Sequence, residues 1–153
     1  LADKAKALGD EDGSIFRKSL ERYLDSGYGE CFLSRPEIAW MVVNALKFHH
    51  KKKYLLHAWM IMPNHGHILA TPLPGFELRK IAHSIKSFTA HEANKMLGRT
   101  GQFWQHEIFD RYIRNREHFF NVIDYIESNP VKAGLCRSSS EWPYSSASLD
   151  DSK

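Results

Sequence analysis

The sequence has 153 residues, of which 42% are hydrophobic and 12% aromatic, and its formal net charge is +3. This length supports a single domain, residues 1–153, with a loose tail expected from about residue 147. No run of about eighteen apolar residues and no secretory signal occurs, so we expect a cytoplasmic protein that does not enter a membrane. Two cysteines without a C-x-x-C pair suggest neither a disulfide framework nor a thiolate zinc site. The small positive charge permits nucleic-acid binding without requiring it.

Hydrophobic periodicity predicts two helices and then a hairpin in the first half of the chain. Apolar residues recur at helical intervals over Ser14–Asp25 and again over Pro36–Lys47, where Ser34 is the candidate N-cap. Tyr54–Met62 and His65–Thr71 have the aromatic and apolar content of buried strands and are separated by a Pro-Asn turn.

The second half of the chain predicts two further helices around a short strand. A long amphipathic helix over Leu78–Leu97 buries Phe88 with its apolar face and ends at Gly98. A short strand over Ile108–Tyr112 precedes a helix over Arg116–Ser128, which Pro130 closes. This order of elements predicts an α+β sandwich in which helices pack on an antiparallel sheet.

The clearest chemical motif is the pair His65 and His67 at the start of the second hairpin strand. Alternate residues of a strand point to the same face, so both imidazoles share one face while Gly66 leaves the other free for close packing. Neutral imidazole suits a divalent metal, and amide, carboxylate, water or substrate oxygens can complete the site. Taken alone, however, a His-x-His pair is more often structural than metal-binding.

A second motif lies on the last predicted helix, where Tyr125 and Asn129 are four residues apart and therefore share one face. Asn129 could ligate a metal while Tyr125 presents a nucleophilic phenol beside it. Two plainer interpretations stay open: a core aromatic for Tyr125 and a helix-end residue for Asn129. Tyr112, which lies among arginines, is the main rival nucleophile.

A set of basic and aromatic residues could hold a DNA strand. The cations could cover backbone phosphates, although any one of them taken alone is more often part of a solvated face. The aromatic side chains could stack on bases. The cations are Lys86, Arg111, Arg114 and Arg116, and the aromatic residues are Phe103, Trp104, Phe109 and Tyr112. Four further histidines, His57, His83, His91 and His106, have no spacing that requires a ligand role.

Several separated strings, in order from about residue 27 to residue 146, resemble the REP-associated tyrosine transposases. These belong to the IS200-like single-tyrosine transposases that carry a His-hydrophobic-His (HUH) motif. The strings are HAWMIMPNHGHIL, SIKSFTAHEAN, GQFWQHEIFDRYIR, YIESNPVKAGL and EWPYSSA.

The resemblance implies a ferredoxin-like core and an enzyme that cleaves and rejoins single-stranded DNA at hairpins of palindromic repeats. It implies that Tyr125 forms a 5′-phosphotyrosine link and that His65, His67 and Asn129 bind Mg²⁺ or Mn²⁺. The partner would be hairpin-containing DNA, and the protein itself a monomer or a homodimer.

Two departures from the family pattern bear on activity. Gly66 stands where a bulky apolar residue usually separates the histidines, which should loosen the packing of that strand. An internal strand of the family's sheet is expected before Leu1, outside this sequence. The departures motivate an alternative, a hairpin-binding protein of the same fold that has lost cleavage. A third hypothesis is a metal-dependent hydrolase that uses water instead of tyrosine.

Overall fold

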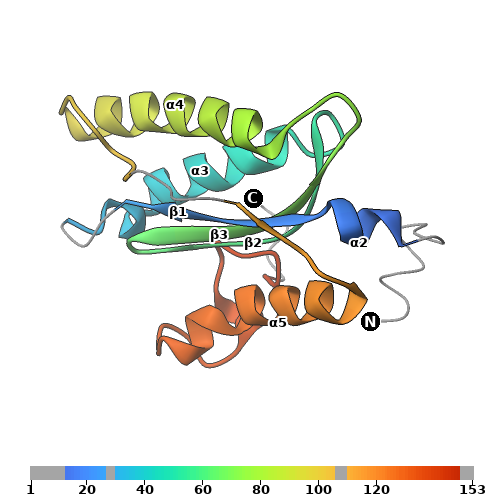
Figure 1. Ribbon diagram of the computed structural model, residues 1–153. Helices are drawn as coiled ribbons and strands as arrows, with labels where there is room; N and C mark the ends of the chain where they lie inside the picture. The colour runs from blue at the N-terminus through green and yellow to red at the C-terminus, as the bar shows by residue number, and fades with distance from the viewer. Residues whose placement is uncertain (1–12, 27–29, 106–109, 149–153) are drawn as a thin grey trace.

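The computed structural model describes residues 13–26, 30–105 and 110–148, which form a four-stranded antiparallel sheet with helices on both faces (Figure 1). The strand order is β2-β3-β1-β4. The strands are β1 (Leu20–Asp25), β2 (Tyr54–Met62), β3 (His65–Pro72) and β4 (Arg111–Tyr112). With α3 (Pro36–Phe48) between β1 and β2 and α4 (Leu78–Leu97) between β3 and β4, this is the predicted ferredoxin-like α+β core.

Helices α3 and α4 cover one face of the sheet, and α5 (Arg116–Lys132) adds a layer on the other (Figure 1). Each face has its own buried hydrophobic cluster. The first contains Ile38 and Val42 of α3 and Ile81 and Ile85 of α4. The second is built around Phe119 and other residues of α5. None of the helices among the described residues is long and apolar enough to span a membrane.

The helix predicted over Ser14–Asp25 is wrong beyond Lys18. A short helix, α2 (Ser14–Lys18), ends there, and the chain extends at Ser19 to enter β1. Leu20 and Leu24 are both buried, but a spacing of four residues fits one face of a strand as well as one face of a helix. The strand forms because β1 pairs with β3 on one side and β4 on the other. Within the described residues, β1 is thus an internal strand of the sheet, between β3 and β4.

The hairpin and the long helix are confirmed. β2 and β3 pair antiparallel across the Pro63–Asn64 turn, and α4 ends at Gly98, whose φ of +64° is readily adopted by glycine. Two details differ from the prediction. The N-cap of α3 is Arg35 rather than Ser34, which belongs to a 3₁₀ turn (Phe32–Ser34), and Phe88 is exposed.

Helix α5 does not stop at Pro130, as predicted, but continues through it to Lys132. A proline inside a helix costs about 3 kcal/mol, and burial of Pro130 in the fold offsets part of that cost. Asn129 is consequently a helical residue, not a helix end. Of the predicted strand Ile108–Tyr112, Arg111 and Tyr112 form β4, while residues 108 and 109 lie outside the described residues.

Candidate active site

Strand β3 directs both motif histidines toward the layer formed by α5. His67 pairs with Met60 of β2 and with Tyr23 of β1, and Met60 belongs to the hydrophobic cluster under α5. His65 lies two residues earlier on the same face. His67 is completely buried and His65 is half-buried. The expected common orientation of the two imidazoles is therefore present.

Gly66 points to the opposite face, where the side chain of Ile61 occupies the space beside it. A Cβ at position 66 would lie 2.8 Å from Ile61 Cδ1 and 3.2 Å from the carbonyl oxygen of Met60. Both contacts are shorter than ordinary van der Waals packing. The expectation that Gly66 loosens the strand is wrong, because the missing side chain is replaced by Ile61.

Glu21 is a buried carboxylate that lies between two histidines. Its Oε1 lies 3.1 Å from His67 Nε2, and its Oε2 lies 3.7 Å from Nε2 of His118 on α5. Burial alone would raise the pKa of this carboxyl group, but the hydrogen bond to His67 and the nearby positive charges, including Arg111, lower it overall. Glu21 thus carries a negative charge next to a candidate metal ligand.

Two tyrosines enclose the His67 ring. Tyr23 of β1 stacks on it with a centroid distance of 4.0 Å, and Tyr125 of α5 meets it edge-on at 5.9 Å. Burial, with the neighbouring Tyr125 and Glu21, raises the pKa of Tyr23 to about 12. Tyr125 remains 44% exposed, so its phenol is accessible from solvent. His67 Nδ1 is buried in this enclosure without a hydrogen-bond partner among the described residues.

The direction of α5 brings Asn129 toward His65. Phe119 of α5 contacts His57 of β2, and Tyr125 contacts His67, so α5 runs opposite to β3. Four helical residues rise about 6 Å, close to the roughly 6.6 Å that separates alternate strand residues. Asn129, one turn beyond Tyr125 and partly buried, is therefore level with His65.

The donor atoms on this face suit a divalent cation. His67 Nε2 is bonded to Glu21, and His65 Nδ1 lies 2.9 Å from Asn64 Oδ1, so each ring has its other nitrogen left to ligate. Burial lowers the pKa of His65, His67 adds to that effect and Asp25 opposes it. Within the described ranges, no group of three or more His, Cys, Asp and Glu side chains is arranged to hold a metal ion. Asn129 carries an amide oxygen, a donor that divalent cations accept beside imidazole.

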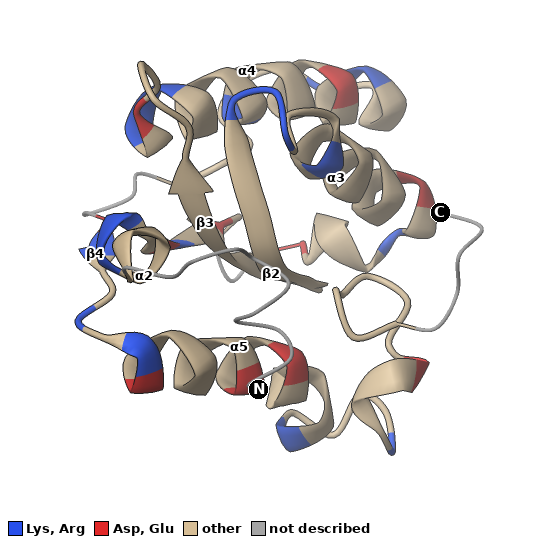
Figure 2. Cartoon of the chain, turned by 90° about the vertical axis from the view of Figure 1, so that its right-hand side faces the viewer, with Lys and Arg blue, Asp and Glu red and all other residues tan. Residues whose placement is uncertain are grey.

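The structure groups three of the four predicted DNA-contacting cations. Arg111 lies on β4, Arg114 follows it and Arg116 begins α5, and all three residues are exposed. Figure 2 shows basic residues near β4 and in the first turn of α5. Lys86 lies on α4, in the other helical layer, and donates to the carbonyl oxygen of Gln105 at 3.1 Å. It does not join the arginines.

The predicted stacking residues are separated in the same way. Phe103 and Trp104 are buried in the core, so their proposed stacking on bases is wrong. Phe109 and His106 lie outside the described residues. Tyr112 is exposed, but it pairs with Leu20, which faces α3 and α4, so it lies on the other face of the sheet from His67.

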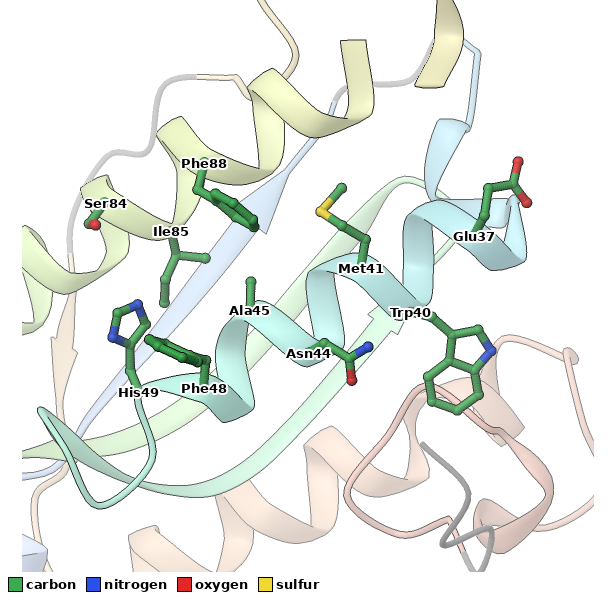
Figure 3. A pocket seen from close by; sticks show the side chains of 10 residues that line it. All are labelled: Glu37, Trp40, Met41, Asn44, Ala45, Phe48, His49, Ser84, Ile85 and Phe88. Atoms are coloured by element: carbon green, nitrogen blue, oxygen red, sulfur yellow. The ribbon is translucent and has the colours of Figure 1, made fainter. Parts of the chain in front are cut away.

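A pocket of about 720 Å³ lies between α3 and α4 (Figure 3). Apolar side chains, among them Met41, Phe48 and Phe88, line most of it. The sheet separates this pocket from the histidines on the α5 side, so it is not part of the candidate site.

Sequence reasoning missed Glu21, Tyr23 and His118. The first two were missed because a helix was predicted over their segment. In a strand, positions 21, 23 and 25 lie on one face. His118 precedes Tyr125 by seven residues, two turns on the same helical face, and that spacing was a usable signal.

Comparisons with known proteins match this arrangement to one family. A sequence model of the family described as Transposase IS200 like matches residues 41–129, more than half of the chain. The chain belongs to the IS200-like transposase family. The matched stretch of this IS200-like protein contains His65, His67, Tyr125 and Asn129, whereas Glu21 and Tyr23 precede it.

Individual relatives are consistent with this assignment. The chain is 27% identical over 106 residues to a REP-associated tyrosine transposase of Escherichia coli (strain K12), covering 69% of this chain and 61% of that protein. It is 32% identical over 102 residues to a Haemophilus influenzae protein provisionally given the same description, covering 59% of this chain and 57% of the relative. The chain therefore spans less than two thirds of the length of either relative.

A solved structure shares the fold. It is described as a REP-associated tyrosine transposase bound to a REP hairpin, and it superposes with a TM-score of 0.68 at 24% sequence identity. The match covers 86% of this chain and 77% of that one.

Proposed function

We propose that this IS200-like protein is a metal-dependent single-tyrosine transposase that cleaves and rejoins single-stranded DNA beside hairpins. The observation that carries the proposal is the contact of the exposed Tyr125 ring with the buried His67 ring, with Asn129 one helical turn farther along. On this proposal, α5 presents a nucleophile and an amide donor to the face of the sheet that carries His65 and His67.

In the proposed reaction, the phenol oxygen of Tyr125 attacks a backbone phosphorus atom. The bond from phosphorus to the 3′ oxygen breaks, the phenol proton is lost to solvent, and the departing 3′ oxygen gains a proton. The product is a 5′-phosphotyrosine link with a free 3′-hydroxyl. Attack by another 3′-hydroxyl reverses these bond changes and joins strands without a nucleotide energy source.

The residues around Tyr125 support this chemistry. A neutral phenol is a weak nucleophile, so it needs positive charge at the phosphate. His65, His67 and Asn129 would hold Mg²⁺ or Mn²⁺, which acts as a Lewis acid on the scissile phosphate. Arg111, Arg114 and Arg116 would bind the flanking phosphates. The hairpin bound in the similar solved structure supports hairpin DNA as the substrate.

A second candidate function is hairpin binding without cleavage. Complete burial of His67 beneath Tyr23 favours it, because an ion from solvent has less access to a ligand enclosed in this way. Gly66 no longer supports it, since Ile61 fills the adjacent space.

The two functions differ in whether a covalent product forms. The protein would be incubated with Mg²⁺ or Mn²⁺ and a labelled single strand that contains a hairpin, and denaturing gels would detect a protein–DNA adduct. We expect an adduct that disappears in Tyr125→Phe and persists in Tyr23→Phe, a matched control on the adjacent phenol. Hairpin binding without any adduct would favour the second candidate, and an adduct that survives in Tyr125→Phe would refute the assigned nucleophile.

A further inference from the structure

Glu21 connects the candidate metal ligand His67 to the first turn of α5. The carboxylate is 6% exposed, its Oε1 lies 3.1 Å from His67 Nε2, and its Oε2 lies 3.7 Å from His118 Nε2. The strand that carries it pairs on both sides, with β3 and with β4. The backbone of Glu21 is therefore fixed by strand pairing on both sides, and its carboxylate lies between the two histidines.

His118 is oriented independently of Glu21. The backbone N–H of Arg114 donates to His118 Nδ1 at 3.0 Å, and the Asn115 side chain accepts from the backbone N–H of His118 at 2.8 Å. With Nδ1 accepting, the proton of a neutral His118 resides on Nε2, the nitrogen that faces Glu21. The carboxylate is thus flanked by two imidazole N–H groups.

The same reasoning fixes the tautomer of His67. An ionised carboxylate only accepts hydrogen bonds, so Glu21 requires a proton on His67 Nε2. In a neutral ring, the lone pair is then on Nδ1, the atom that is buried without a hydrogen-bond partner among the described residues. Buried nitrogen atoms in folded proteins nearly always have a bonding partner, and a metal ion bound to Nδ1 would be such a partner.

We infer that Glu21 is a positioning residue that holds His67 in the Nε2–H tautomer and thereby leaves Nδ1 to ligate a divalent cation. This inference rests on the proposed function, because it assigns His67 a metal. In protein metal sites, a carboxylate that accepts from the second nitrogen of a ligating histidine fixes the tautomer and raises the basicity of the ligand. The sequence shows no such partner in the two motifs, because Glu21 lies 46 residues before His67.

The tautomer can be measured without metal and without DNA. Long-range ¹H–¹⁵N correlation spectra distinguish the two neutral tautomers of a histidine ring in the labelled protein. We expect the Nε2–H form for His67 in the wild-type protein. If His67 carries its proton on Nδ1, the inference is overturned without any variant.

Variants then test whether Glu21 is the cause. In Glu21→Ala, we expect a mixture of His67 tautomers and an affinity for Mn²⁺ alone that is weaker by about 10- to 100-fold, measured by calorimetry. Glu21→Gln keeps an oxygen acceptor and should retain both the tautomer and most of the affinity. Glu77→Ala, at an exposed glutamate before α4, is the matched control and should change neither.

The outcomes separate this inference from the proposed function. Weaker Mn²⁺ binding by Glu21→Ala with an unchanged His67 tautomer would mean that Glu21 is only structural, and would overturn the inference. A wild-type protein that forms no DNA adduct, while Glu21→Ala still changes the tautomer, would overturn the proposed cleavage and support the positioning of His67.

Discussion

The two faces of β3 differ in what they bury. Toward α3 and α4, the strand presents Gly66, Ile68 and Ala70, and this face is closed by aliphatic packing in which Ile61 fills the space beside the glycine. Toward α5 it presents His65 and His67, and here burial depends on polar partners such as Glu21. One strand thus joins a packed core to a cluster of titratable groups.

The contrast indicates how the site is kept in shape. Tightly packed interiors respond to the addition or loss of a single methylene, so the α3–α4 face sets where the strand lies. On the α5 face, the half-exposed Tyr125 can lose its hydroxyl group without leaving a cavity. Changes on the packed face should therefore alter stability, and changes on the α5 face should alter chemistry.

The largest expected effect is on chemistry. Tyr125→Phe removes the attacking oxygen, and we expect adduct formation to fall by about 10³-fold or more, as for other nucleophile substitutions. The free energy of unfolding should change by less than about 0.5 kcal/mol, because the ring and its contact with His67 remain. Quantitative gel assays and urea denaturation measure the two effects. A large loss of stability would mean that Tyr125 is a core aromatic.

The next largest effect is on the packed face. Gly66→Val places methyl groups against Ile61, and overpacking of this kind costs about 1–3 kcal/mol. Urea denaturation should show this loss of stability. At a temperature where the variant is still folded, any decline in adduct formation should come only from displacement of the strand.

A double variant tests the cause. Ile61→Ala alone should destabilise the protein by about 2–5 kcal/mol through the cavity that it leaves. Combined with Gly66→Val, it exchanges volume between directly paired positions, so the double variant should be more stable than the sum of the two single effects. Strict additivity would show that the two side chains do not compete for the same space.

The sequence correctly predicted those elements whose hydrophobic periodicity fits only a helix or only a strand. The β2–β3 hairpin and α4 were found with nearly correct bounds, and the relation between His65 and His67 followed from strand alternation alone. β1 was mistaken for a helix because Leu20 and Leu24 fit both periods. Only pairing with distant segments decides such a case, and that information is not local.

The same limit explains which site residues were missed. Tyr125 and Asn129 are four residues apart, so local geometry relates them to each other. Glu21 reaches His67 across 46 residues through the sheet, and no local pattern predicts that contact. Lys86 was grouped with three arginines by charge alone, whereas the structure places it in the other helical layer.

That separation predicts a smaller effect. If Arg111, Arg114 and Arg116 each cover one phosphate, replacing all three with alanine should reduce the salt slope of single-strand binding by about 2, from roughly 0.7 per contact. Lys86→Ala, in the other helical layer, is the matched control and should leave the slope unchanged. Fluorescence anisotropy over a range of salt concentrations measures the slopes. If Lys86→Ala reduced the slope as much as the triple arginine variant does, DNA would contact both helical layers.

The smallest expected effect concerns a histidine far from the candidate site. His50 follows α3, and its Nδ1 accepts from the backbone N–H of Leu56 at 2.9 Å. Burial and the nearby Lys51 lower the pKa of His50, so the unfolded chain binds this proton at a higher pH than the native protein does. The contribution of neutral His50 to the free energy of unfolding is therefore complete above about pH 6.5 and declines as the pH falls below that value. Urea denaturation at about pH 7.5 and about pH 5.5 should show a larger acid-induced loss in the wild-type protein than in His50→Asn, whose amide oxygen still accepts from Leu56. An equal loss in both proteins would assign the acid sensitivity to other groups, among them His65, whose pKa is lowered in the same direction.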